Sequence, residues 1–231
     1  MSTRMNRVAA LGGVGYVVLS MVAIFQTPLP DMDNSPDEIR AFLATDPRAG
    51  VWAETVLLLF ALFGLLLFAA RLSIELRDAG KRWEIHASLV VGSAVVYGSV
   101  TLFATAVAAG VVQRLPNPPP VAEAVTLLDL NSIAHFLSAA VLAVMCVAAA
   151  HVSLVTRVLP RWTAWLGLVA AAAALAGIVV LPHSRDPFHY AATVLLAWIV
   201  SVSIVLAARR HPHQPVATTS HPQAEQVETA G

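Results

Sequence analysis

Six apolar stretches, each long enough to cross a bilayer, constrain this chain more than any other feature. They run over residues 8–25, 51–70, 87–112, 127–152, 164–181 and 190–208. A helix rises about 1.5 Å per residue, so about 20 residues cover a hydrocarbon core of roughly 30 Å. Inside a bilayer each backbone amide must find its partner within its own segment, which favours helices. The sequence therefore predicts an all-α, polytopic membrane bundle of six transmembrane helices over residues 1–210.

The composition agrees with this interpretation. Apolar residues make up 58% of the chain and charged residues 12%, against about 25% charged residues in a typical soluble domain. A soluble helical protein of this length needs polar helix faces, and the six stretches have almost none. The composition therefore excludes an ordinary soluble domain.

The positions of the basic residues predict the orientation. Lysine and arginine are retained on the cytoplasmic side of a membrane during insertion. If the N-terminus is cytoplasmic, only four of the 14 lysine and arginine residues fall in outer segments, and ten fall in inner ones. The outer four are Arg40, Arg48, Arg114 and Arg185. Both termini are therefore expected to be cytoplasmic.

The longest outer connection contains a predicted short helix. Residues 35–38, Ser-Pro-Asp-Glu, have the form of a capping box: serine at the N-cap, proline at the first helical position and glutamate three residues after the cap. Ile39, Phe42 and Leu43 follow at helical spacing. We therefore expect an amphipathic helix over about residues 36–44, on the outer face or over the bundle mouth.

Two cytoplasmic segments have distinct predictions. Residues 71–84 mix both signs of charge and are expected to continue the second transmembrane helix before the chain turns near Gly80. Residues 211–231 are rich in proline, glutamine and threonine and have no apolar face. A segment of that composition cannot bury enough apolar surface to fold, so we predict a disordered tail.

Ionisable side chains within the spans are the first candidates for a functional site, because they are costly in a bilayer. Glu54 lies about one turn into the second span from the outer side, and Asp129 is similarly shallow in the fourth span. Both are within reach of interfacial water. They are candidates for a site, and solvated helix ends are the alternative.

A deeper set of polar residues lies on the third and fourth spans. His135 is a little over two turns into its span, too deep for an imidazole to reach the interface comfortably. Asn131 and Ser138 are four residues before it and three after it, which places all three on one helix face. Tyr97 and Thr101 share a face of the third span by the same spacing. We therefore predict a polar seam between these two spans.

Two interpretations of the polar residues remain open. In the first, the side chains only hydrogen-bond across helices, each bond contributing about 1 kcal/mol or less. In the second, they form a ligand or proton site made of His135, Asn131, Tyr97, Thr101, Glu54 and Asp129.

The sequence offers no motif for an enzyme, a cofactor or a metal. It contains no His-Glu-x-x-His, no phosphate-binding glycine loop, no Gly-x-Ser-x-Gly and no set of histidine boxes. Cys146 is the one cysteine, so neither a disulfide nor a cysteine metal site is expected. His86 and His151 fall near one inner boundary, but His151 lies roughly 160° around its helix from His135, which argues against a haem site. The scattered basic residues do not indicate nucleic-acid binding.

Three segments carry a resemblance to a known kind of protein. They are residues 35–43 (Ser-Pro-Asp-Glu-Ile-Arg-Ala-Phe-Leu), 127–131 (Leu-Leu-Asp-Leu-Asn) and 159–167 (Leu-Pro-Arg-Trp-Thr-Ala-Trp-Leu-Gly). With its six spans, the chain resembles a family of uncharacterised bacterial integral membrane proteins of the domain-of-unknown-function type. The resemblance implies a multi-pass protein of the bacterial plasma (inner) membrane and supplies no activity.

These observations together favour a non-enzymatic binding or accessory protein. Its expected partners are the lipid bilayer and a small ligand, a lipid or a partner membrane protein held at the polar seam. The alternative is a small proton-coupled transporter that uses His135 as the titrating group.

Overall fold

The computed structural model describes residues 3–26, 29–30, 33–115, 117–180 and 186–209. Within these residues every regular element is helical, which confirms the predicted all-α class. In chain order the elements are α1 (Thr3–Gln26), α2 (Pro36–Ala44), α3 (Arg48–Asp78), the 3-10 turn η1 (Lys81–Trp83), α4 (Glu84–Gln113), α5 (Val121–Thr156), α6 (Arg161–Val180) and α7 (Asp186–Ala208). The predicted tail from residue 211 lies outside the described residues.

Six of the described helices, all except α2, are long and apolar enough to cross a membrane. Large apolar side chains on these helices point outward; Phe60, Phe103, Trp165 and Val179 are each more than half exposed. Many of the buried positions between helices are alanines instead. Small residues inside and large apolar residues outside are expected when hydrocarbon surrounds the bundle. The chain is thus an integral, multi-pass membrane protein.

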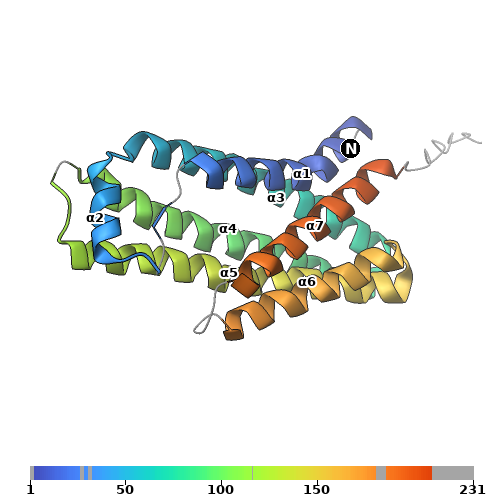
Figure 1. Ribbon diagram of the computed structural model, residues 1–231. Coiled ribbons are helices and arrows are strands. Elements are labelled where there is room, and N and C mark those ends of the chain that lie inside the picture. The colour runs from blue at the N-terminus through green and yellow to red at the C-terminus, as the bar shows by residue number, and fades with distance from the viewer. Residues whose placement is uncertain (1–2, 27–28, 31–32, 116, 181–185, 210–231) are drawn as a thin grey trace, which may run out of the picture.

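Helices α1, α3, α4 and α5 run roughly along one axis, α7 crosses them obliquely, and α2 lies across one end of the bundle, named here the α2 end (Figure 1). The N-terminus and the end of α7 lie together at the opposite end (Figure 1). The helices differ in length: α5 has 36 residues and α6 has 20, or about 54 Å and 30 Å at about 1.5 Å per residue. As a result, α3, α4 and α5 extend further toward the α2 end than α6 and α7 do (Figure 1).

The predicted helix in the long connection is α2, and its capping box forms. The Ser35 backbone N–H donates to the Glu38 carboxylate at 2.6 Å, and the Glu38 backbone N–H donates to Ser35 Oγ at 3.3 Å. The Ser35 N–H lowers the pKa of the exposed Glu38 carboxyl. On its inner face, α2 packs against α3, α4 and α5 through a small apolar core that includes Ile39, Leu43, Val51, Val112 and Leu128.

Removing the cap is expected to loosen α2. Ser35→Ala should cost about 1 kcal/mol of local helix stability, and amide hydrogen exchange over residues 39–43 should accelerate. Because the folded-state pKa of Glu38 is lowered, the contribution of its carboxylate is complete above the unfolded pKa of about 4.3 and is lost as the pH falls through the lower folded value. Unchanged exchange in Ser35→Ala would show that the packing of Ile39 and Leu43 alone holds α2.

Helices α1 and α3 come into backbone contact at a pair of glycines. A Cβ atom added to Gly64 would lie 2.6 Å from the carbonyl oxygen of Gly12, and one added to Gly12 would lie 2.5 Å from the carbonyl oxygen of Gly64. Real Cβ atoms do not approach backbone oxygens this closely, so only glycine fits at either position. The contact sets the distance between α1 and α3.

A buried ion pair lies near the end of the bundle opposite α2. Arg71 and Glu75, one turn apart on α3, form a salt bridge and are 2% and 5% exposed. Arg209, which follows α7, places its Nη1 3.5 Å from Glu75 Oε2. The chain then turns between α3 and α4 at Gly80, as predicted, with a left-handed φ of 132°. Glu75 therefore links α3 to the end of α7.

Candidate functional site

A cavity of about 550 Å³ lies inside the bundle, and all six spanning helices contribute to its wall. Along three of these helices it separates two apolar cores. The larger core lies toward the chain termini and the smaller one beneath α2. On α3, Glu54 and Leu58 line the cavity between Val51 of the smaller core and Ala61 of the larger core. The cavity is therefore a break in the packing at one level of the bundle.

The polar lining of the cavity is concentrated at this level. On α4 the polar lining residues lie between Ala94 and Ala108, and on α5 between Leu128 and Leu142, again with one core on each side. The polar side chains at the cavity are Tyr16, Ser20, Glu54, Tyr97, Thr101, Thr105, Asn131, Ser132 and His135. The antiparallel arrangement of α4 and α5 thus places the polar seam at one depth.

Five of the six candidate site residues line this one cavity. They are Glu54, Tyr97, Thr101, Asn131 and His135. Asp129 is not among the lining residues and is partly exposed on α5. Two candidates considered separately from the sequence, shallow Glu54 and deep His135, therefore open onto the same space. That this space holds a ligand or a proton pathway remains a prediction.

At the cavity, none of the described polar side chains on α4 forms a hydrogen bond with one on α5. Thr105 donates to the carbonyl oxygen of Thr101 on its own helix, and Ser138 donates to the carbonyl oxygen of His135. Asn131 is 6% exposed, yet its side-chain oxygen has no hydrogen-bond partner among the described residues, and neither has Glu54 Oε2. A buried polar atom without a partner costs about 1–3 kcal/mol. These two acceptors favour a cavity that takes up another molecule over a purely structural seam.

The protonation of His135 follows from its one hydrogen bond. Its Nδ1 lies 2.9 Å from the backbone carbonyl oxygen of Asn131. A carbonyl oxygen can only accept, so Nδ1 carries the hydrogen. In the neutral ring Nε2 is then an acceptor. His135 thus adds a further acceptor to the lining of the cavity.

A tyrosine pair forms the wall contributed by α1 and α4. Tyr16 Oη and Tyr97 Oη are 2.7 Å apart, with the rings edge to face. One hydroxyl donates to the other, which leaves one hydroxyl hydrogen for another acceptor. Sequence reasoning did not select Tyr16. The signal that was available is its four-residue spacing from Ser20, which places both side chains on one face of α1.

His86 and His151 form a separate cluster, away from the cavity and toward the end of the bundle opposite α2. His86 Nε2 lies 2.9 Å from His151 Nδ1, and both rings pack edge-on against Trp83. The two histidines thus meet, while His135 lies at the cavity, as the helical spacing predicted. Among the described residues no group of three histidine, cysteine, aspartate or glutamate side chains is placed to hold a metal ion. Cys146 is buried and forms no disulfide.

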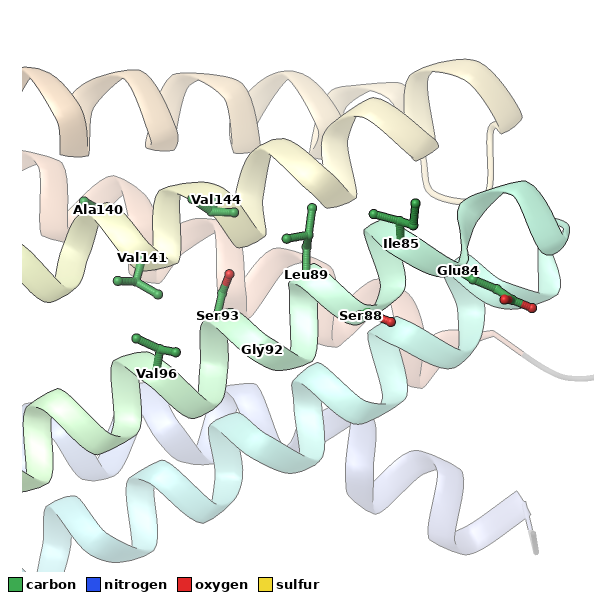
Figure 2. A pocket seen from close by; sticks show the side chains of 10 residues that line it. All are labelled: Glu84, Ile85, Ser88, Leu89, Gly92, Ser93, Val96, Ala140, Val141 and Val144. Atoms are coloured by element: carbon green, nitrogen blue, oxygen red, sulfur yellow. The ribbon is translucent and has the colours of Figure 1, made fainter.

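The outer surface of the bundle carries a second, apolar hollow. Figure 2 shows a groove between α4 and α5 that runs from Glu84 to Val96 and is closed on its far side by Ala140, Val141 and Val144. Its wall is mostly apolar, with Glu84, Ser88 and Ser93 as the polar lining residues, and Ala140 follows directly on Ala139, which lines the internal cavity. The two hollows thus lie on different faces of α5.

We compared the chain with protein-family models, with curated proteins and with solved structures, and no match was found in any of the three comparisons.

Proposed function

We propose that this protein is a non-enzymatic binding protein that holds one small amphipathic molecule within the membrane. The observation that carries the proposal is the internal cavity, where Glu54 Oε2 and the buried Asn131 Oδ1 have no hydrogen-bond partner among the described residues. The volume of about 550 Å³ falls in the range of about 300–1,000 Å³ typical of small-molecule sites. A mostly apolar wall with a few polar groups is also typical of such sites.

The proposal includes where the protein works. The resemblance of residues 35–43, 127–131 and 159–167 to bacterial membrane proteins supports a bacterial plasma membrane. The excess of basic residues in one set of connections supports cytoplasmic termini. In this orientation the α2 end faces outward and the cavity lies in the outer half of the bundle.

Blocking the cavity should abolish binding of a neutral amphiphile. The probe is n-octanol, whose hydroxyl both donates and accepts, added to the full chain in detergent and counted by native mass spectrometry. The wild-type protein is expected to bind one octanol per chain. Ala139→Phe places a phenyl ring in the cavity. It should weaken octanol binding at least about tenfold, because ring and ligand together would overpack the space and overpacking is costly.

The matched control is Ala140→Phe, the same change one residue further along α5, which fills the surface groove instead. It should leave octanol binding unchanged. Thermal unfolding of both variants establishes that they are folded. Equal octanol binding by a folded Ala139→Phe variant and the wild type would contradict the proposal.

The alternative, a small proton-coupled transporter, is favoured by one observation: the titratable side chains of Glu54 and His135 line the same cavity. In that case His135→Gln, which keeps a donor and an acceptor but cannot titrate, should abolish proton movement on addition of octanol to proteoliposomes. A pure binding protein should show no proton movement, whether position 135 holds histidine or glutamine.

A further inference from the structure

The chemistry of the cavity wall also indicates which kind of head group it takes; this inference rests on the proposed function. Among the described residues that line the cavity, Glu54 is the one with a carboxyl side chain. No lysine or arginine is among the described residues that line the cavity. The described part of the wall thus offers no lysine or arginine to neutralise an anionic ligand.

The hydrogen-bonding groups of the wall also suit a ligand that donates hydrogen bonds. Glu54 Oε2 and Asn131 Oδ1 are acceptors without partners, and the neutral ring of His135 has an acceptor at Nε2. Both tyrosine hydroxyls engage each other, so together they offer only one hydrogen. The hydroxyls of Ser20 and Thr101 also have no partner among the described residues, and a hydroxyl accepts as well as donates. A ligand that brings donors can therefore satisfy all of these groups.

We propose that the ligand is a cationic amphiphile, a primary ammonium group on an apolar body. Its ammonium group binds at the Glu54 carboxyl, with the Asn131 side-chain oxygen as a further acceptor in the same cavity. An ammonium group supplies three donors and no acceptor, and its bonds to a carboxylate are charge-assisted. The apolar body lies against the side chains of α1 and α7 that line the cavity, among them Met21, Ile24 and Leu195.

An ammonium group could come from an aminophospholipid or from a free alkylamine. The absence of lysine and arginine among the described lining residues distinguishes between them. An aminophospholipid carries a phosphate next to its amine, and that phosphate would find no cation at the described wall. A free alkylamine carries no anion. The structure therefore favours a free amine over a lipid head group.

The test compares three probes that share an eight-carbon chain: octylamine, octanol and octanoate. Their dissociation constants are measured at pH 7 by native mass spectrometry of the full chain in detergent. The wild-type protein should bind octylamine at least about tenfold more tightly than octanol, and octanoate more weakly than octanol. Dioctanoyl phosphatidylethanolamine is the fourth probe, and failure to displace octylamine assigns the site to free amines.

Glu54→Gln should remove the preference for the amine. Its octylamine affinity should fall at least about tenfold, and by a larger factor than its octanol affinity, because the amide still donates and accepts but carries no charge. Asp129→Asn is the matched control: it removes a carboxyl at similar depth that does not line the cavity, and its octylamine affinity should be unchanged.

The outcomes separate the two proposals. If octanoate binds as tightly as octylamine to the wild-type protein, or if Glu54→Gln retains its affinity for octylamine, the cationic ligand is wrong while a binding cavity stands. If none of the four probes binds at one per chain, the proposed function itself fails. The wild-type comparison of octylamine with octanoate needs no variant and therefore does not depend on how Glu54→Gln folds.

Discussion

Replacing Glu75 with alanine is expected to destabilise the bundle by about 3–5 kcal/mol. The change removes the carboxylate that pairs with Arg71 and contacts Arg209. Arg71 is 2% exposed, so its charge would remain buried without this partner, which is the most costly way to break a buried ion pair. The measurement is the free energy of unfolding in mixed detergent micelles.

Two further variants test the physical reason for this loss. Asp78→Ala removes an exposed carboxylate from the end of the same helix and should change stability by less than about 0.5 kcal/mol. The double variant Arg71→Met/Glu75→Leu removes both charges and should recover most of the loss, because apolar replacement of a buried pair is often neutral or stabilising. A Glu75→Ala protein as stable as Asp78→Ala would show that the pair contributes nothing.

Substituting leucine at Gly64 is expected to separate α1 from α3. The new side chain begins where a Cβ would lie 2.6 Å from the carbonyl oxygen of Gly12, so the backbone of α1 must move. Overpacking of this kind costs about 1–3 kcal/mol or more. The shift should also break the hydrogen bond between Tyr16 and Tyr97 in the cavity wall. Thermal unfolding measures the loss of stability, and octanol binding measures the change in the cavity.

Gly92→Ala is the control for the glycine substitution. Gly92 is also within a long helix, but an added Cβ there would meet no atom within 4 Å. Alanine in place of a helical glycine stabilises by roughly 0.5–1 kcal/mol when it meets no obstacle. A Gly64→Leu protein that matches Gly92→Ala in stability and in octanol binding would show that the glycine contact does not set the position of α1.

The helices could be predicted from the sequence because hydropathy reports directly on contact with lipid. The ends of the helices were harder to predict. α5 begins at Val121, whereas the apolar stretch begins at residue 127. The additional residues include the exposed, charged Glu123, which interrupts the apolar pattern while the helix continues. Hydropathy therefore shows the apolar part of a helix and not its whole length.

The polar seam was predictable from spacing, because residues three or four apart on one helix share a face whatever surrounds it. That Glu54 and Tyr16 face the same cavity was not predictable, because it depends on which helices are neighbours. α1 and α3 are consecutive spans, but the order of spans does not give the α1–α7 contact or the approach of Tyr16 on α1 to Tyr97 on α4. The sequence thus identified candidates on each helix, and the packing decided which of them meet.

Arg71 and Glu75 were assigned from the sequence to an inner segment, on the basis of topology. The structure buries both within α3. Opposite charges four residues apart within a helix form a pair that was visible in the sequence. Its burial and the approach of Arg209 to Glu75 depend on how the other helices pack around α3, which the spacing along α3 does not contain.

The unequal lengths of α5 and α6 make the hydrophobic thickness of this protein differ from one side to the other. Around α6, about 30 Å of helix matches an ordinary hydrocarbon core, whereas α5 offers a longer surface. A bilayer meets such a mismatch by local thickening or by tilting the helices, at fractions of a kcal/mol per Å. Since α5 and α7 form separate parts of the cavity wall, any change of tilt between these two helices would change the width of the cavity.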